Sequence, residues 1–453
     1  MLSFLISLLG IFITIFLVIG IHEFGHFITA RLCGIKVLRF SIGFGKTLFR
    51  KQDKRGTEYV ISLIPLGGYV KMLDEAEEPV PSSELPYAYN RQPIYKRIAV
   101  IAAGPFFNFI FSAVLYYVLF VVGFTTIIPI TGNILSNSAA AHAGMKPQEE
   151  ILQIDHHPVS TWYSIVIKLL ERTGDKNTLN IETQDLKSKK HETYSLDLSQ
   201  WKMDALKPDP LESLGITPFQ PNILPVIFII QKNSPAEHAG LKIGDKIVSL
   251  NNKSIKDWME LITTIVNAPE KTFNFEILRD GKIIVLPVTI GYQRNIFYKK
   301  HGYLGIAPNI TYPKNLLRIE QYSPIEAFFR SAEEVKNFTD LNFIILGKMF
   351  TGKVSIQSLG GPLTIFESAG HALNNGMIAF MSFLAFLSIS IGVINILPIP
   401  GLDGGHLLFQ LVESIRGKPL SERILLLFYR LGLVLLFFLI IQSLSNDLLR
   451  ALG

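Results

Sequence analysis

The stretch IGIHEFGHFITA, residues 19–30, places two histidines and a glutamate at the end of an apolar run. No charged residue occurs between Met1 and Ile21, and the run from Leu2 to about Arg31 exceeds the roughly 20 residues that cross a bilayer. No basic segment precedes the run and no small-residue cleavage site follows it. We therefore expect a retained membrane span and not a removable signal peptide. Ionisable groups are costly at membrane depth, so these three residues are candidates for a functional role.

The composition indicates a membrane protein with a sizeable water-exposed part. Only 18% of the 453 residues are charged and 49% are hydrophobic, whereas soluble domains carry about 25% charge. The net charge of +6 is modest, and we interpret it as loop charge and not as a nucleic-acid-binding surface. The single cysteine, Cys33, excludes an internal disulfide, and we expect it to serve in packing.

Three further apolar runs are long enough to span a bilayer: Ile98–Phe124, about Gly376–Leu397, and Ile424 to about Ile441. The fourth run is weakened by Arg430, which could extend towards the interface. Lysine and arginine are concentrated between runs one and two and between runs three and four, which predicts that these loops face the cytosol. Both termini and the segment from about 125 to 375 would then lie outside.

This long segment contains an internal repeat. NSAAAHAGMKPQEEILQID (137–155) aligns without gaps on NSPAEHAGLKIGDKIVSLN (233–251), an offset of 96 residues (137 to 233). The repeat predicts two copies of a small α/β domain, at about 126–221 and 222–310. In the second copy we expect strands at PVIFIIQ and KIVSLNN, a capped helical turn at SPAEHAG, and an amphipathic helix at IKDWMELITTIVN.

The second copy resembles the PDZ domains of bacterial envelope proteases, because SPAEHAGLKIGDKIVSLN matches their AGL-x-x-GD-x-I pattern. The first copy departs from it, with Gln148 and Glu149 where the second has Gly244 and Asp245, so a modified turn is expected there. The resemblance implies binding of extended peptides or chain ends by strand addition. The alternative is that the two domains only block access.

After the repeat, SPIEAFFRSAEEVKNFTDLNFIILGKMF (323–350) has a helix start signal and separate polar and apolar faces. We expect an amphipathic juxtamembrane segment, 311–375, that lies against the outer membrane surface and leads into the third run.

The opening stretch has the pattern H-E-x-x-H at His22, Glu23 and His26. On a helix, positions i and i+4 lie on one face, so the two imidazoles could bind one zinc ion, with Glu23 close enough to act as general base. Zinc needs a third protein ligand. The candidate is Asp403 in NILPIPGLDGGH (395–406), whose prolines and glycines interrupt the helix at membrane depth. The alternative role for Asp403 is an N-cap for the helix that follows.

H-E-x-x-H in the first span, followed far downstream by N-x-x-P-x-P-x-L-D-G-G, resembles the site-2 protease family of intramembrane metalloproteases, and the likeness covers essentially the whole chain. The resemblance implies a bacterial inner-membrane zinc endopeptidase with ligands His22, His26 and Asp403 and base Glu23. It implies periplasmic PDZ-like domains and an active site towards the cytosolic side. The implied substrates are single-span membrane proteins, such as an anti-sigma factor or signal-peptide remnants, cut after another protease has removed most of their outer domain.

Further segments match the family. GPFFN (104–108) lies in the second run, where small residues let helices approach closely, and Asn395 precedes the P-x-P segment. Asn108 and Asn395 are candidate substrate-binding residues. Alternatively, Asn108 makes a polar contact inside the bundle and Asn395 supports the aspartate loop. We expect His406 to be structural and not a ligand. Residues 40–72 predict strands that resemble the family's membrane-associated β-hairpin. Its edge at Gly67, Gly68 and Tyr69 could pair with an unwound substrate, or the hairpin could only brace the bundle.

The expected organisation is therefore a polytopic α-helical membrane protein with four transmembrane helices, two PDZ-like α/β domains and a β-hairpin region. Its parts are 1–125, 126–221, 222–310, 311–375 and 376–453. The main alternative function is a catalytically inactive, membrane-anchored PDZ scaffold. A metal transporter is disfavoured because polar residues cluster at one depth. A soluble-type protease on an anchor is disfavoured because H-E-x-x-H does not lie in the outer domain.

Overall fold

The computed structural model describes residues 2–76, 78–205, 208–220, 223–294, 300–309, 312–418 and 420–452. Within these residues, four helices are long and apolar enough to cross a membrane: α1 (Leu2–Leu32), α2 (Ile94–Val122), α10 (Met377–Ile396) and α12 (Glu422–Leu452). They correspond to the four predicted spans. The last helix continues well past the predicted end at Ile441, because its final turns pack against another part of the chain.

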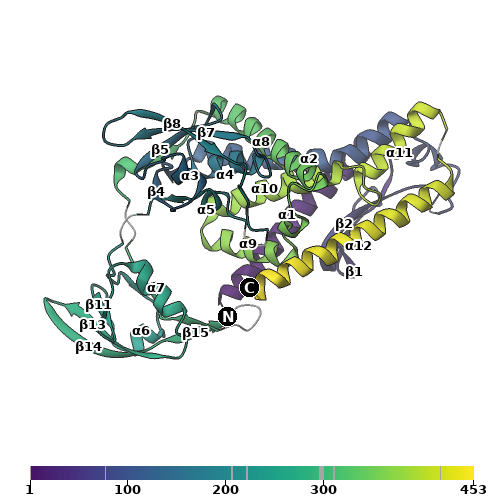
Figure 1. The fold of residues 1–453 in the computed structure, drawn as a ribbon. Helices are drawn as coiled ribbons and strands as arrows, with labels where there is room; N and C mark the ends of the chain where they lie inside the picture. The colour runs from purple at the N-terminus through teal and green to yellow at the C-terminus, as the bar shows by residue number, and fades with distance from the viewer. Residues whose placement is uncertain are drawn as a thin grey trace.

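Helices α1, α2 and α10 form the centre of the membrane part, while α12 is largely exposed (Figure 1). The close approach of α1 to α2 depends on Gly25, where an added Cβ would lie 2.5 Å from the Ala103 carbonyl oxygen. Between α2 and α10, the Ser112 hydroxyl donates to the Ala385 carbonyl at 2.9 Å. Small residues thus bring the helices together, as is usual inside membranes.

The final turns of α12 hold the start of α9 (Pro362–Asn374), which also packs on α1. Asp447 is 4% exposed and accepts hydrogen bonds from the backbone N–H groups of Gly361 and Leu363, both at 2.9 Å. This carboxylate caps the positive end of α9, which gives α12 a fixed attachment although most of its length is exposed.

Strands β1 (Val37–Gln52) and β2 (Glu58–Met72) confirm the predicted hairpin but pair in a way that the sequence did not indicate. Ser41 is paired with Tyr69 and with Val60, and Val60 is also paired with Arg50. Both strands therefore bend back, and the first half of β1 lies between the two halves of β2. The bend in β1 uses Gly43 at φ 91°, a conformation that glycine adopts without strain.

Two α/β units correspond to the two copies of the repeat. The first contains β4 (Thr131–Ile134), α3 (Ala139–His142), β5 (Glu149–Ile154), β6 (His157–Pro158), α4 (Trp162–Glu171), β7 (Thr178–Asp185), β8 (His191–Asp197), α5 (Pro210–Leu214) and β9 (Ile216–Pro218). The second contains β10 (Ile229–Ile230), α6 (Pro235–His238), β11 (Lys246–Leu250), β12 (Lys253–Ser254), α7 (Trp258–Val266), β13 (Thr272–Arg279), β14 (Lys282–Thr289), β15 (Gly291–Arg294), β16 (Lys300–Tyr303) and β17 (Ile306–Ala307). Their sheets have the equivalent orders β6-β5-β7-β8 and β12-β11-β13-β14.

The backbone repeats as well as the sequence. Asn137 and Asn233 have φ 61° and 57°, and Gln148 and Gly244 have φ 64° and 95°. The expectation of a modified turn at Gln148 is therefore wrong, because glutamine adopts the left-handed conformation that Gly244 has in the second unit. The predicted strand PVIFIIQ is shortened to Ile229–Ile230, because this segment changes partner from β11 to β17. The predicted boundary at residues 221 and 222, and the predicted end at residue 310, lie outside the described residues.

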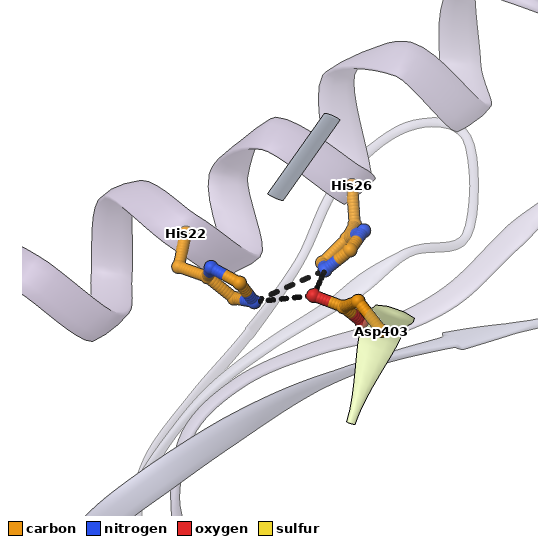
Figure 2. A group of neighbouring side chains, drawn as sticks. All are labelled: His22, His26 and Asp403. Carbon is orange, nitrogen blue, oxygen red and sulfur yellow. Dashed lines mark hydrogen bonds and ion pairs between the residues drawn. The ribbon is translucent and has the colours of Figure 1, made fainter. Parts of the chain in front are cut away.

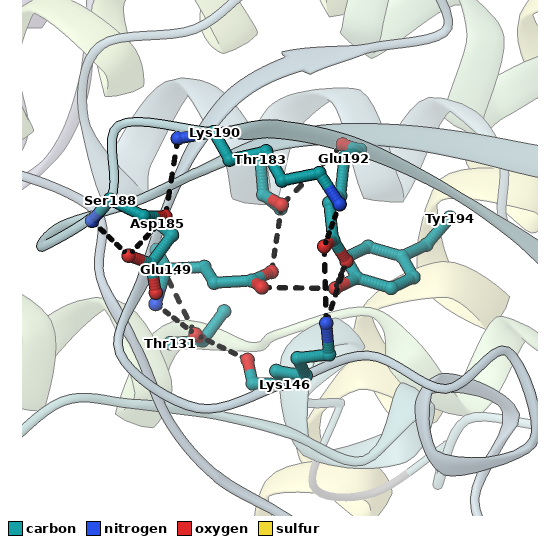
Figure 3. A network of polar contacts seen from close by, with 9 residues as sticks. All are labelled: Thr131, Lys146, Glu149, Thr183, Asp185, Ser188, Lys190, Glu192 and Tyr194. Atoms are coloured by element: carbon teal, nitrogen blue, oxygen red, sulfur yellow. Dashed lines mark hydrogen bonds and ion pairs between the residues drawn. The ribbon is translucent and has the colours of Figure 1, made fainter.

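The two copies also differ in the groups that contact one buried acid, which is Asp245 in the second unit and Glu149 in the first. Asp245 is 1% exposed and forms two 2.7 Å hydrogen bonds with the Arg279 guanidinium. In the first unit, Glu149 accepts from the Thr183 hydroxyl at 2.7 Å and lies 3.0 Å from the Tyr194 hydroxyl (Figure 3). Thr183 does not occupy the position of Arg279, because Ile151 pairs with Thr183 where the equivalent Ile247 pairs with Ile277. An ion pair in one copy is therefore replaced by hydroxyl contacts from another strand position in the other.

The first unit is fixed to the membrane part, whereas the second lies apart from the helices (Figure 1). Strand β3 (Phe124–Ile127), at the end of α2, pairs with β18 (Leu317–Glu320), which leads into α8 (Pro324–Phe350). Arg318 in β18 donates to Glu150 at 2.8 Å, and Lys348 in α8 lies 3.3 Å from Asp175. These charged contacts hold the first unit against α8.

Helix α8 begins at the predicted start signal, where the Ser323 side chain accepts from the Glu326 N–H. It is more deeply packed than a helix lying only on a membrane surface. Phe338 and Leu341 are buried with residues of α2 and α10, while Phe328 and Phe329 on another side are exposed.

Candidate metal centre

The two histidines of the H-E-x-x-H pattern lie one turn apart on α1, as predicted. Their side chains are buried, each residue being 8% exposed, and the Nε2 atoms lie 3.3 Å apart. The helix is continuous through this stretch because it packs closely on α2, where Gly25 faces the Ala103 carbonyl. Both imidazoles therefore point to one place between α1, α2 and the start of α11 (Asp403–Arg416).

Asp403 reaches the same place by a sharp change of direction after α10. The helix stops at Ile396, Gly401 takes φ 94°, and α11 starts at Asp403. Gly404 packs against the end of α10, since an added Cβ would lie 2.1 Å from the Leu397 carbonyl oxygen. Asp403 is the first helical residue, the cap position is Leu402, and there is no side-chain cap hydrogen bond. The alternative N-cap role for Asp403 is therefore wrong.

The three side chains form a compact triangle of ligand atoms (Figure 2). Asp403 Oδ2 lies 3.0 Å from His22 Nε2 and 3.4 Å from His26 Nε2. Ligands bound tetrahedrally to zinc at 2.0–2.1 Å are about 3.3 Å apart, so these separations fit one zinc ion. Asp403 Oδ2 is also buried without a hydrogen-bond partner among the described residues, as expected of an oxygen kept for a metal.

Both histidines are held from behind by α2. His26 Nδ1 lies 2.8 Å from the Val100 carbonyl oxygen, which requires a proton on Nδ1 and leaves the lone pair on Nε2 for a metal. The Asn108 amide lies 3.3 Å from His22 Nδ1, and its Oδ1 has no hydrogen-bond partner in the described part of the chain. Reversing the amide would let Oδ1 accept the Nδ1 proton of His22. Asn108 is fully buried, and we assign it to the support of His22, while its contact with substrate stays a prediction.

The absence of a side chain at Gly104 leaves room for the imidazole rings of both histidines. An added Cβ at this position would lie 2.2 Å from His26 Nε2 and 2.9 Å from His22 Cε1. The sequence suggested close helix approach at GPFFN but gave no sign that Gly104 faces the histidines. The Val100 contact was also missed, because any residue can supply a carbonyl oxygen.

Glu23 lies between the metal centre and the β1–β2 sheet. Its side chain contacts Gly68, where an added Cβ would lie 2.6 Å from Glu23 Cγ and 2.8 Å from the Ser41 carbonyl oxygen. Gly67 likewise has no room for a side chain, because Phe44 lies over it. Tyr69 stacks on Phe44 with ring centroids 6.2 Å apart. The predicted substrate edge is therefore next to the predicted general base.

The remaining predicted residues flank this centre. Asn395 lies in the last turn of α10 and is half-buried. Its contact with substrate stays a prediction. His406 lies one turn after Asp403, with Nδ1 3.4 Å from the Tyr429 hydroxyl of α12. It is not part of the ligand triangle.

Comparisons with known proteins agree with this geometry. The model of peptidase family M50 matches residues 10–439. The regulator of sigma-E protease RseP of Salmonella typhimurium is 40% identical over 451 residues, covering 99% of this chain and 100% of that protein, and the Escherichia coli K12 protein of the same name matches equally well. A Vibrio cholerae protein named as a zinc metalloprotease is 33% identical over 446 residues, 98% of each chain. The chain belongs to peptidase family M50 and is a metalloprotease, not an inactive scaffold.

Proposed function

We propose that this protein is an intramembrane zinc endopeptidase that cleaves the transmembrane segments of single-span membrane proteins. The observation that supports this most strongly is the position of the ligand triangle. Two of its members lie on an apolar helix long enough to cross a membrane, and the third lies directly after another such helix. A peptide bond would reach this place from within the bilayer more readily than from water.

His22, His26 and Asp403 would hold the metal, which when bound supplies Lewis acidity that polarises a carbonyl and acidifies a water molecule. The Glu23 carboxylate would accept a proton from that water and later pass it to the leaving amine. The Val100 carbonyl and the Asn108 amide would keep the imidazoles oriented through both steps.

The β2 edge offers a way to expose the bond to be cut. A helical substrate hides its peptide groups in i to i−4 hydrogen bonds. In the described residues the sheet consists of β1 and β2 alone, and the Gly68–Met72 half of β2 pairs with β1 on one side only. Its other edge could pair with an unwound substrate at Gly67, Gly68 and Tyr69, beside Glu23. This arrangement favours strand addition over a hairpin that only braces the bundle.

The distribution of charge supports an orientation in the bacterial inner membrane. Basic residues are frequent in the loops before α2 and before α12, so these loops would be cytosolic and both α/β units periplasmic. The metal centre would then lie towards the cytosolic side. The PDZ-like units would bind peptides or chain ends, or limit access by size.

The names of the relatives suggest the setting of the reaction. Several are called regulators of sigma-E protease, which supports a role in regulated intramembrane proteolysis, with a membrane-bound anti-sigma factor as one substrate. Signal-peptide remnants form a second substrate class that the same site would accept, because they too are single apolar segments.

Mapping the cut bond tests this proposal. The purified protein would be reconstituted in liposomes with a tagged single-span protein that lacks most of its outer domain, and the products identified by mass spectrometry. We expect cleavage inside the apolar segment. Cleavage only in the water-exposed flanks, by protein that contains zinc, would contradict the proposal.

A further inference from the structure

A cavity of about 470 Å³ lies on the opposite end of α2 from its cytosolic loop, where α2, α8 and the first α/β unit meet. Its walls come from the last turns of α2, the start of α4, the strands β3 and β18, and one side of α8. This size matches sites for small ligands or headgroups. The metal ligands are not among its lining residues.

Aromatic side chains line the cavity. Two of them, Tyr116 and Tyr163, pack on the buried ring of Phe338, with ring centroids 6.0 Å and 5.3 Å away. Phe120 and Trp162 also line the space. Aromatic faces attract cations, most strongly where water is excluded.

Among the described residues, Glu334 has Asn337 as its hydrogen-bonding neighbour and no cation within ion-pair distance. The Tyr116 hydroxyl is buried, lies close to Tyr163, and has no hydrogen bond of standard geometry among the described residues. Glu334 and both tyrosines line the same cavity. Of the two cations that act on Glu334, Lys168 is paired with Glu171 at 3.0 Å, whereas Arg330 makes only a long, exposed contact of 3.9 Å with Glu326.

Three acids line the cavity, namely Glu320, Glu333 and Glu334, against one base, Arg330. The Arg330 side chain is half exposed and lies over the Tyr322 ring at 5.0 Å. The cavity therefore has an acidic, aromatic interior with a cation beside it. This arrangement is complementary to a ligand that has an ammonium group and a phosphate a short distance apart.

We propose that this cavity binds the ethanolamine headgroup of a phospholipid, with the primary ammonium at Glu334 and Tyr116 and the phosphate at Arg330. A primary ammonium fits better than a quaternary one, because its N–H groups can donate to the carboxylate and to the tyrosine oxygen. The position of the cavity near the ends of two membrane-spanning helices supports a lipid as the molecule that carries the headgroup. Tyr116 is six residues before the end of α2 at Val122, about 9 Å at 1.5 Å per residue, and the cavity also reaches Ser382 near the start of α10.

This placement rests on the proposed orientation, in which both helix ends lie at the outer interface. A headgroup held there would join α2, α8 and the first α/β unit, so the lipid would stabilise the attachment of that unit to the membrane part.

The test is native mass spectrometry of the delipidated full chain, titrated with phosphatidylethanolamine, phosphatidylcholine and phosphatidylglycerol of equal chain length. The wild type is expected to bind one phosphatidylethanolamine at least about tenfold more tightly than the other two, the effect of a hydrogen bond to a charged group. Glu334→Gln and Tyr116→Phe should weaken this preference, while Asp340→Asn on the exposed side of α8 should keep it.

Equal binding of the three lipids by the wild type, or a preference retained in Glu334→Gln, would overturn the proposal. A competition experiment distinguishes a lipid headgroup from other molecules that carry an ammonium group. Displacement of the lipid by O-phosphoethanolamine supports headgroup recognition, whereas binding of a lysine-containing peptide in place of any lipid would contradict it. The readout is lipid binding, so it does not depend on the proposed protease activity.

Discussion

His22 and Asp403 lie near opposite ends of the chain, yet His22 Nε2 is 3.0 Å from Asp403 Oδ2. The contact joins the first apolar helix to the turn after the third, and α2 closes the site from behind. Most of the chain between the two residues forms units outside this helical centre. The metal centre thus depends on how three helices pack.

Gly104→Ala should remove metal binding without unfolding the protein. The added Cβ would lie 2.2 Å from His26 Nε2, so the imidazole would have to leave the ligand triangle. We expect zinc affinity to fall by at least about 100-fold, measured by competition with a chelator. Gly347→Ala in α8 is the control, because an added Cβ there meets no atom within 4 Å. Unchanged zinc affinity in Gly104→Ala would show that the site described here does not hold the metal.

Asn108→Leu tests the support of His22. The substitution keeps the branching of the side chain but removes the amide that lies 3.3 Å from His22 Nδ1. Loss of such contacts typically lowers metal affinity by about 10- to 100-fold. Ser112→Ala, one turn further along α2, removes a buried hydroxyl that contacts backbone carbonyls and not His22, so it should retain the metal. Equal zinc affinity in both variants would contradict the assignment.

The repeat provides a matched pair of substitutions. Arg279→Ala leaves the Asp245 carboxylate buried without its cation, which should destabilise the second unit by about 3 kcal/mol. Thr183→Ala removes one hydroxyl donor to Glu149, the equivalent acid of the first unit, and should cost only about 1 kcal/mol. Hydrogen exchange of each unit in the full chain measures both effects. A larger effect for Thr183→Ala would contradict this account.

The stability of the delipidated protein should depend on Glu334 near neutral pH. Burial raises the pKa of this carboxyl to about 7 from an ordinary 4.5, and the neighbouring Glu333 adds to the shift, while Asn337, Arg330 and Lys168 oppose it. Below pH 4.5 the group is protonated in both states and has no effect. Between pH 4.5 and 7 the folded state holds its proton more tightly, so stability falls as pH rises.

Glu334→Gln removes this dependence. Its midpoint of thermal unfolding should exceed that of the wild type by at least about 2 °C at pH 8, with the difference vanishing towards pH 4.5. Asp340→Asn should show no such pH dependence, because Asp340 is half exposed and paired with Lys336. A constant difference across the range would exclude a titrating Glu334.

The sequence predicted the parts of the site that depend on residue type. The spacing of His22 and His26 specifies two imidazoles on one helical face, and the isolated Asp403 among prolines and glycines indicates a turn with one carboxylate. Long apolar runs likewise predicted the four spans. The 96-residue offset predicted two equivalent units, which the left-handed residues Asn137 and Asn233 repeat in the backbone.

Features that depend on tertiary contacts could not be predicted. The Val100 carbonyl has no side-chain signature, and Gly104 resembles any small residue between packed helices. The double pairing of Ser41 with Tyr69 and Val60 requires both strands to bend, whereas an alternating pattern indicates only that strands are present. Gln148 takes the conformation of a glycine because the surrounding turn is fixed by its neighbours.

Cleavage by the Glu23→Gln variant tests the central claim most directly. The purified wild type and variant would be assayed with a tagged single-span substrate in detergent, and bound zinc would be measured in both. We predict that the variant retains zinc and loses cleavage, because glutamine keeps the shape of Glu23 but cannot accept the proton. Equal cleavage by the two proteins, or no zinc in either, would contradict the mechanism.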